Sequence, residues 1–414
     1  MTAVHITFGQ NGAGRMKQPL QSTSPPRFLP FVLVGMLLIV TTTGFARMAY
    51  GLILPYMEKD LGLSVSMGGM LGTIMFLGYL VTVGLSGLLA VRWGGKAVLL
   101  IGGSAVIVSM FGLTWASSFM SIAPFMFLSG AGSALVFTPL MSIMLGCFPD
   151  RKGTVLGILL SGAGIGMLLS GILVPFLDVQ FPDWGWRAVW LSFGVLSLAV
   201  ILTAFVILRN PEARGSDSND KDKPAWFKNK GLMKVAWLYF LIGLAYLIPN
   251  LYQTGFMLGQ GLSDRTAGFI YSVAGIFSIV GSPIWGTLSD RFGIPRMFIL
   301  AWVCAVAGDL VPVVYPSIPG FVISSMLWGS SIGGLITLIQ LKAAQQVPQR
   351  FVATAIGFIS VFYAVGQMLG PGLSGWIIEL GGNYTAAYGF GAAIYAVGLG
   401  VTLYAGKAEQ KLAS

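Results

Sequence analysis

Long apolar runs separated by short polar breaks dominate the chain. Twelve runs are long enough to cross a bilayer, since about 20 apolar residues in a helix span the hydrocarbon core. They are predicted at 29–56, 67–90, 97–116, 121–147, 154–177, 188–208, 234–256, 267–288, 297–315, 320–342, 352–378 and 384–405. The pattern therefore predicts an all-α membrane protein with twelve transmembrane helices.

The polar segments divide the chain into five parts. A polar leader covers 1–28, a tail covers 406–414, and the longest internal polar stretch, 209–233, falls at the centre. Its Ser, Asp, Asn and Lys residues offer too little apolar surface to form a core, so we read it as a solvated linker. It separates a six-helix bundle at 29–208 from a second bundle at 234–405.

The two halves carry the same short motifs at a constant offset of 199 residues. GLS at 62–64 recurs at 261–263, and the pattern GxLxxRxG at 87–94 recurs at 286–293. Such an offset predicts two pseudo-symmetric bundles. Parallel repeats of this kind place a substrate site near the midplane, between the halves.

Composition supports a membrane location and excludes several function classes. Only 9% of the residues are charged, against roughly 25% in soluble domains. The net charge is +10, but the basic residues lie between the apolar runs and form no single nucleic-acid-binding face. The two cysteines lie in apolar context and the single histidine, His5, lies in the leader. We therefore expect no disulfide framework, no metal, no cofactor and no enzymatic activity.

Lysine and arginine set the expected orientation. With the N-terminus inside, 20 of the 24 basic residues fall on the inner side, and only Lys59, Arg187 and Arg265 fall on the outer side. The positive-inside rule then places both termini and the linker in the cytoplasm. We expect a bacterial cytoplasmic membrane protein, most simply a monomer.

Specific motifs resemble those of a known family. The loop GTLSDRFGIPR at 286–296 resembles the motif G-x-L-a-D-r-x-G-r-r of the Major Facilitator Superfamily, while the first-half copy has Val91 at the acidic position. The stretch GAGIG at 162–166 is similar to the Gly-rich motif of the family's fifth helix. Within the superfamily, GFARMAY at 44–50 resembles the bacterial YbfB/YjiJ-type branch, and FPDRKG at 148–153 resembles monocarboxylate-type carriers more weakly. The resemblance implies a twelve-helix carrier.

Arg47 is the one basic residue predicted inside a span, where a charge costs a few kcal/mol or more. Thr43 and Tyr50 share its helix face by their spacing. The guanidinium either forks onto a substrate carboxylate in a central cavity, or it is structural and bonds to backbone carbonyls or a neighbouring helix.

Polar side chains on later spans are further candidates for the cavity lining. Tyr246 stands 199 residues after Arg47, and the resemblance implies a cavity lined mainly by the first, fourth, seventh and tenth helices. The alternative for each residue is interhelical hydrogen bonding. The candidates are Tyr246, Asn250, Gln253, Trp328, Ser331, Tyr363 and Gln367.

The resemblance also implies a gating role for the inner loops. Asp290 is expected to pair with Arg350 when the carrier faces outward. Asp309 is predicted to be the only acid well inside a span, as a proton-coupling site or as a structural carboxyl group. The gating candidates are Gly87, Arg92, Gly286, Asp290, Arg291 and Arg350.

The sequence favours a secondary active transporter of a small organic anion, working by alternating access with a proton gradient or exchange. Its expected partners are the substrate, the lipid bilayer and protons, without nucleic acid. An efflux pump for drugs or amphipathic compounds is the alternative within this class. A membrane sensor or enzyme on a similar bundle is the alternative from another class, and the spans lack the clustered His, Cys or paired carboxylates that an enzyme would need.

Overall fold

A computed structural model of the protein describes residues 27–210, 226–348 and 351–413. Within these ranges the secondary structure is helical and contains no strand. Twelve helices there are long and apolar enough to cross a membrane. The expected all-α architecture with twelve candidate spans is confirmed.

The first candidate span is one continuous rod, Phe28–Leu61, built from three segments. These are α1 (Phe28–Ile39), the π-helix η1 (Val40–Met48) and α2 (Tyr50–Leu61). The rest of the first bundle is α3 (Val65–Trp93), α4 (Gly95–Trp115), α5 (Phe119–Cys147), the 3-10 turn η2 (Pro149–Arg151), α6 (Lys152–Gln180) and α7 (Trp186–Ile207). The second half is η3 (Trp226–Lys228), α8 (Lys230–Gly259), α9 (Asp264–Phe292), α10 (Ile294–Val314), α11 (Ile318–Ala344), α12 (Val352–Gly381) and α13 (Tyr384–Ala413).

Some helices are longer than the hydropathy pattern predicts. The first rod ends at Leu61 instead of residue 56, with Pro55 inside it. Helix α8 begins at Lys230 because the Asn229 side chain accepts a hydrogen bond from the Leu232 amide (3.0 Å), four residues before the expected start at 234. Helix α13 continues to Ala413, through the segment expected to be a tail. Capping and helix continuity extend these elements beyond their apolar cores.

The structure confirms the internal repeat. Helices α3 and α9 both have 29 residues, and α4 and α10 both have 21. Ser64 and Ser263 cap α3 and α9 in the same way, each accepting from the amide three residues later. Gly94 and Gly293 make the same turn at φ +86° and +87°, a conformation that glycine adopts without a steric penalty.

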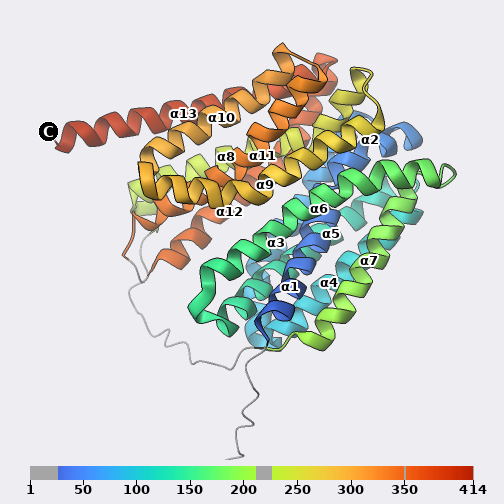
Figure 1. Ribbon diagram of the computed structural model, residues 1–414, viewed down its shortest axis with the longest axis horizontal. Coiled ribbons are helices and arrows are strands. Elements are labelled where there is room, and N and C mark those ends of the chain that lie inside the picture. Colours follow the sequence, from blue (N-terminus) through green and yellow to red (C-terminus); the bar gives the residue numbers. More distant parts are fainter. Residues whose placement is uncertain (1–26, 211–225, 349–350, 414) are drawn as a thin grey trace, which may run out of the picture.

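The helices form two bundles, α1–α7 and α8–α13, drawn below and above in Figure 1. The bundles meet where α6 packs on α9, α3 on α12, and α2 on α8. We call the side with the turns at Gly62, Gly185, Gly261 and Gly382 the hairpin end. The opposite side, with the turns at Gly94 and Gly293 and with Asn210 and Trp226 on either side of the connection between the bundles, is the linker end.

The two bundles are in contact at the hairpin end and diverge towards the linker end. At the hairpin end, Gly171 of α6 lies against Gly268 and Ser272 of α9, and Gly69 of α3 lies against Pro371 of α12. Nearer the linker end of the same four helices, the space beside several glycines is empty to 4 Å. These are Gly84, Gly87, Gly153, Gly157, Gly286 and Gly357. The helices diverge at that end in Figure 1, so the protein is in a state open at the linker end.

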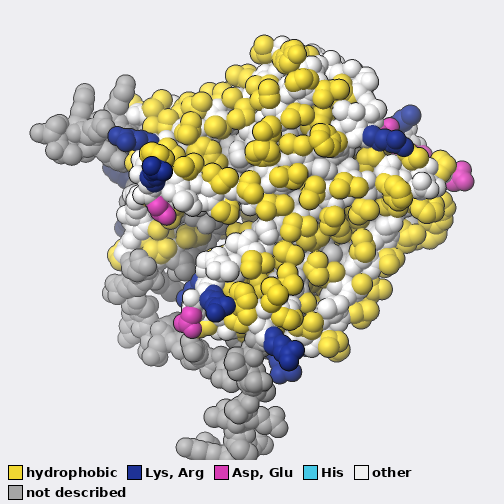
Figure 2. Space-filling view, in the orientation of Figure 1, with side chains coloured by type: hydrophobic (Ala, Val, Ile, Leu, Met, Phe, Trp, Pro, Cys, Tyr) yellow, Lys and Arg dark blue, Asp and Glu magenta, His cyan; other side chains and the backbone are white. Residues whose placement is uncertain are grey.

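The flank of the molecule is apolar. Figure 2 shows yellow side chains over this face, with Lys, Arg, Asp and Glu gathered towards its ends. Exposed apolar side chains include Phe176, Phe269, Leu202 and Trp376, each more than half accessible. An apolar surface this wide is unfavourable in water and favourable against lipid tails. The structure therefore supports an integral membrane protein.

Candidate functional site

Arg47 lies at the middle of the first rod, between the two bundles, and is 7% exposed. Its guanidinium carbon stands 4.7 Å from the ring centre of Phe76 and 4.2 Å from that of Tyr79, both on α3. Such cation–π contacts contribute about 0.5–2 kcal/mol each, depending on desolvation. Its Nε is buried without a hydrogen-bond partner among the described residues. The guanidinium charge therefore makes cation–π contacts with two rings and has no anionic partner in the described part of the chain.

The π-helix around Arg47 changes the backbone hydrogen bonding. The Ala49 amide bonds the Gly44 carbonyl five residues back (2.9 Å), as a π-helix requires. The Leu52 amide then bonds the Ala49 carbonyl (3.0 Å) instead of the Met48 carbonyl, which an α-helix would use. The Met48 carbonyl is therefore available to a side chain from another helix.

The second bundle reaches that carbonyl. Tyr271 of α9 donates its hydroxyl to the Met48 carbonyl (2.6 Å) and accepts a hydrogen bond from the amide of Asn250 on α8 (3.0 Å). This chain joins the two bundles next to Arg47. Asn250 therefore takes part in an interbundle network. Nothing in the sequence pattern indicates Tyr271 as its partner.

Tyr246 and Tyr363 face Arg47 from the second bundle, within electrostatic range of its guanidinium. Their rings stack with centres 5.8 Å apart. Gln367 donates to the Tyr246 hydroxyl (3.0 Å), and the Trp328 indole donates to the Tyr246 backbone carbonyl (3.1 Å). Four of the predicted residues, Tyr246, Trp328, Tyr363 and Gln367, thus come together in one wall opposite Arg47.

Other predicted residues lie apart from this group. Tyr50 is fully buried and donates to the Gly68 carbonyl (2.8 Å), within the first bundle. Gln253 donates to the Ser325 hydroxyl (2.9 Å), and Ser331 donates to the Trp328 carbonyl of its own helix (3.2 Å). Thr43, four residues before Arg47, is half-buried in η1. These contacts are interhelical or intrahelical packing.

Asp309 lies inside the second bundle, on α10, and is fully buried. Neither carboxylate oxygen has a hydrogen-bond partner among the described residues. The side chain packs against Gly391 of α13, and Tyr388 and Tyr395 of the same helix are its electrostatic neighbours. Tyr395 is also within electrostatic range of Tyr246.

Glu58 is a further acid of the first rod, three residues before its end at Leu61. Because the first helix continues to Leu61, Glu58 lies within it, and one of its carboxylate oxygens is buried without a partner among the described residues. Tyr50, Tyr252 and Tyr384 surround this carboxyl group from both bundles. The sequence missed it because the predicted span ended at residue 56.

Phe76, Tyr79 and Tyr239 are site residues that sequence reasoning did not select. Phe76 and Tyr79 hold Arg47, and the ring of Tyr239 stacks on Tyr363 at 4.4 Å. The only sequence signal for Phe76 and Tyr79 is their spacing i, i+3 on the second span, a pattern shared with ordinary lipid-facing residues.

The predicted gating residues lie at the linker end. Asp290, Arg92 and Arg291 are exposed on the ends of α9 and α3, and Gly286 has open space beside it. The described residues contain one salt bridge, Arg187 to Asp60 at the hairpin end, so Asp290 is unpaired among them. Arg350 lies outside the described residues.

The side chains near Arg47 differ in kind from those of a metal site. No group of three or more His, Cys, Asp or Glu side chains in the described part of the chain could hold a metal ion. The site contains the Arg47 guanidinium, which has free hydrogen-bond donors. Aromatic rings line it from both bundles, together with amide and hydroxyl groups. Such a set can bind and orient a small anion that has an apolar body.

Sequence comparisons give relatives with transport functions. The family described as "Uncharacterised MFS-type transporter YbfB" matches residues 39–403. The Gentisate transporter of Corynebacterium glutamicum is 26% identical over 398 residues, covering 91% of this chain and 88% of that protein. Monocarboxylate transporter 12 of Rattus norvegicus is 26% identical over 329 residues, covering 70% of this chain. The chain spans just under two thirds, 66%, of that transporter's length.

Solved structures share the fold at low identity. A mutant of the nucleoside transporter NupG superposes with a TM-score of 0.79 at 15% identity, covering 90% of this chain and 99% of that chain. The D-xylose-proton symporter gives a TM-score of 0.76 at 15% identity, covering 91% and 97%. At this identity the likeness concerns the fold alone.

Proposed function

Since the chain belongs to the Major Facilitator Superfamily, in its YbfB-type family, we propose that it carries a small organic anion with a carboxylate group. The matching family is described as one of MFS-type transporters. We propose that the linker end faces the cytoplasm and that the carrier works by alternating access in a bacterial cytoplasmic membrane.

The observation that carries the proposal is the state of Arg47. A buried guanidinium without a counter-ion is costly, and this one has only two aromatic rings as partners among the described residues. A substrate carboxylate would supply the missing charge through two parallel hydrogen bonds. Tyr246 and Tyr363 would contact the body of the substrate from the other bundle.

The relatives add support for this substrate class. The proteins named as gentisate and monocarboxylate transporters are both similar to this chain, and both names denote carboxylates. One relative is instead named as an efflux protein, AgnL12 of Paecilomyces divaricatus, at 26% identity over 88% of this chain. The opening between the bundles at the linker end is compatible with either direction of net movement.

Alternating access follows from a symmetric fold that is closed at one end. In the present state a substrate can enter and leave only from the linker end. Rocking of the bundles would separate α6 from α9 and α3 from α12, and would open the hairpin end. We propose that a proton gradient or exchange drives the cycle, with Asp309 as the candidate proton site.

Counterflow in proteoliposomes tests the proposal. Vesicles are loaded with gentisate or a short monocarboxylate, and entry of the labelled compound is measured in parallel with thermal unfolding of the purified protein. We expect the carboxylates to exchange and to raise the melting temperature by mass action. The matching neutral amides should do neither. Equal exchange of acids and amides would contradict an anion site, and exchange of no compound by a well-folded protein would contradict this substrate class.

A further inference from the structure

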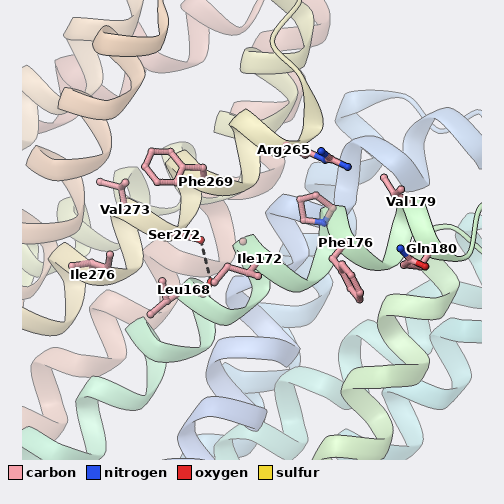
Figure 3. Close-up of a pocket in the computed structure, with 12 residues that line it drawn as sticks. Leu168, Ile172, Phe176, Val179, Gln180, Arg265, Phe269, Ser272, Val273 and Ile276 are labelled. Atoms are coloured by element: carbon pink, nitrogen blue, oxygen red, sulfur yellow. Dashed lines mark hydrogen bonds between the residues drawn. The ribbon is translucent and has the colours of Figure 1, made fainter.

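A cavity lies on the lipid-facing side of the bundle contact, away from Arg47. It has a volume of about 510 Å³ and runs between α6 and α9. Figure 3 shows its apolar walls, including Ile172 and Phe176 on α6 and Phe269 and Ile276 on α9. All four side chains are 45–64% exposed, although they line a concave surface. We call this cavity the α6–α9 groove.

The floor of the α6–α9 groove is sealed. Gly171 and Gly268 approach so closely that a Cβ on either would collide with the other helix. Ser272 donates to the Leu168 carbonyl across the same contact (3.0 Å), and Figure 3 draws this bond. The groove is therefore separated from the space around Arg47, which argues against a lateral substrate entrance here.

The polar groups of the groove lie at its hairpin end. Arg265, the second residue of α9, extends towards the end of α6, where Gln180 lies (Figure 3). Arg265 has no salt bridge or hydrogen bond to another described residue, whereas Arg187 at the same end is paired with Asp60. The groove thus has one unpaired cation at its mouth and apolar walls below it.

The groove has the length of one lipid leaflet. From Gln180 to Leu168 the helix advances about 18 Å at 1.5 Å per residue. Half of a typical hydrocarbon core is about 15 Å. A volume of about 510 Å³ also lies within the roughly 300–1,000 Å³ usual for small-ligand sites.

We propose that the α6–α9 groove binds an anionic glycerophospholipid of the leaflet at the hairpin end. Its phosphate contacts Arg265 and Gln180, and one acyl chain lies along Ile172, Phe269 and Ile276. A lipid in this position contacts both bundles at once, next to the glycine contact that closes the hairpin end. It therefore stabilises the state open at the linker end, because opening the hairpin end would pull the two walls apart.

Only the gating part of this inference rests on the alternating-access function proposed above. Lipid binding is measured without a substrate, by the thermal unfolding of delipidated protein in detergent. Phosphatidylglycerol is compared with phosphatidylcholine of identical chains. At a free concentration ten times the dissociation constant, a bound lipid lowers the unfolding equilibrium constant about elevenfold. We expect this stabilisation from phosphatidylglycerol and much less from phosphatidylcholine.

Two variants and one control locate the effect. Arg265→Gln should remove the difference between the lipids, and Ile276→Trp, at an exposed wall position, should weaken binding of both by filling the groove. Lys59→Gln, which removes another exposed basic residue of the hairpin end, should leave the preference intact. If Arg265→Gln keeps the full preference, or inorganic phosphate reproduces the stabilisation, the proposed lipid site is wrong.

The gating part has its own measurement. Spin labels at Asp183 and Gln260, exposed positions on the two bundles at the hairpin end, report their separation. In the parent, nanodiscs of phosphatidylglycerol should shift the distribution of label distances towards shorter values than nanodiscs of phosphatidylcholine. In Arg265→Gln, the two lipids should give the same distribution. If the lipid stabilises the protein but leaves the distance distribution unchanged, the proposed effect on the conformational equilibrium is wrong, while lipid binding in the groove is retained. Failure of carboxylate counterflow affects neither measurement.

Discussion

Arg47 carries a permanent charge at a depth from which its side chain cannot reach water at either end of the helix. The rings of Phe76 and Tyr79 compensate part of the cost, but they supply no negative charge. The planar guanidinium suits this site because it stacks on Phe76 and Tyr79 and still presents donors along its edge. A lysine ammonium can also lie over an aromatic ring, but it lacks the planar fork that donates two parallel hydrogen bonds.

Replacing Arg47 separates a ligand role from a scaffold role. Arg47→Lys should lower the affinity for the carboxylate by roughly tenfold to a hundredfold, since a charge-assisted bond contributes about 1.5–3 kcal/mol. Its melting temperature without ligand should stay near that of the parent, and Arg47→Ala should abolish transport. Binding and melting are measured in the same detergent, with Arg209→Lys, an exposed position, as the control. Early unfolding of both Arg47 variants without ligand would indicate a scaffold role.

Asp309 allows a similar test of coupling. A carboxyl group buried without a cation or hydrogen-bond donor is costly in its charged form. Tyr395 is within electrostatic range of both Asp309 and Tyr246. Asp309→Asn should keep counterflow exchange but abolish the response of uptake to an imposed pH gradient. Tyr395→Phe should weaken that response. If the Asn variant responds to the gradient as the parent does, Asp309 has a structural role only.

At the level of elements, the π-helix η1 determines how the bundles meet. Its wider turn releases the Met48 carbonyl, and Tyr271 of α9 occupies it. The Thr42 carbonyl accepts from Ser133 (2.5 Å) and the Ala46 carbonyl from Ser129 (3.2 Å), both on α5. Polar side chains of two neighbouring helices thus bond the irregular backbone, as a membrane interior requires.

The Tyr271 bond predicts a shift of the conformational equilibrium. Tyr271→Phe would leave the Met48 carbonyl and the Asn250 amide unpaired in the state open at the linker end. An unsatisfied buried group costs about 1–3 kcal/mol, so the alternative state should gain roughly five- to 150-fold in relative population. The separation of labels at Asp183 and Gln260 should increase accordingly.

Tyr388→Phe is the matched control for this shift. The Tyr388 hydroxyl is buried within the second bundle and has no hydrogen-bond partner among the described residues. Its loss should leave the distance distribution unchanged. Identical distributions for Tyr271→Phe and the parent would show that the interbundle bond does not bias the equilibrium.

At the scale of the whole molecule, the two ends are closed in different ways. The hairpin end is held by helix packing and by bonds between the bundles, such as Tyr56 to Asp264 (2.9 Å) and Ser64 to Glu379 (2.9 Å). At the linker end only the second-half motif has an acid, because Val91 occupies the matching position in the first. A single latch at Asp290 therefore remains a prediction for the opposite state.

Removing that latch should favour the present state. Asp290→Asn and Arg350→Gln should each lower the population of the state closed at the linker end, because the charge-assisted bond is lost. Labels at Asp150 and Arg296, on the two bundles at this end, report the change. The double variant should shift no further than either single variant. Additive shifts would show that the two residues do not act as a pair.

The orientation in the membrane is a separate prediction. The excess of basic residues at the linker end predicts that Ser218, in the connection between the bundles, and Ser414, at the C-terminus, are cytoplasmic. Reporter fusions at both positions in a bacterial host should give a cytoplasmic signal. A periplasmic signal from either would reverse the proposed direction of access.

The sequence by itself determined the spans, the repeat and the position of the buried charge. Lipid requires each crossing segment to satisfy its own backbone bonds and to expose apolar side chains, so these features are readable from local composition. The offset of 199 residues recurs in the helix lengths, the serine caps and the turns at Gly94 and Gly293. Arg47 is conspicuous for the same reason, as a charge within an apolar run.

Only the tertiary structure decided which polar side chains meet and which end is open. Phe76 and Tyr79 look like any aromatic residues of a span, and Tyr271 lies 223 residues from the carbonyl that it bonds. One carboxylate oxygen of Glu58 is buried because the helix continues past the end of its apolar run. Between helices in lipid there is little hydrophobic driving force, so contacts depend on glycine shape and a few hydrogen bonds. Glycine contacts and interhelical hydrogen bonds depend on three-dimensional fit, which the periodic pattern of the sequence does not encode.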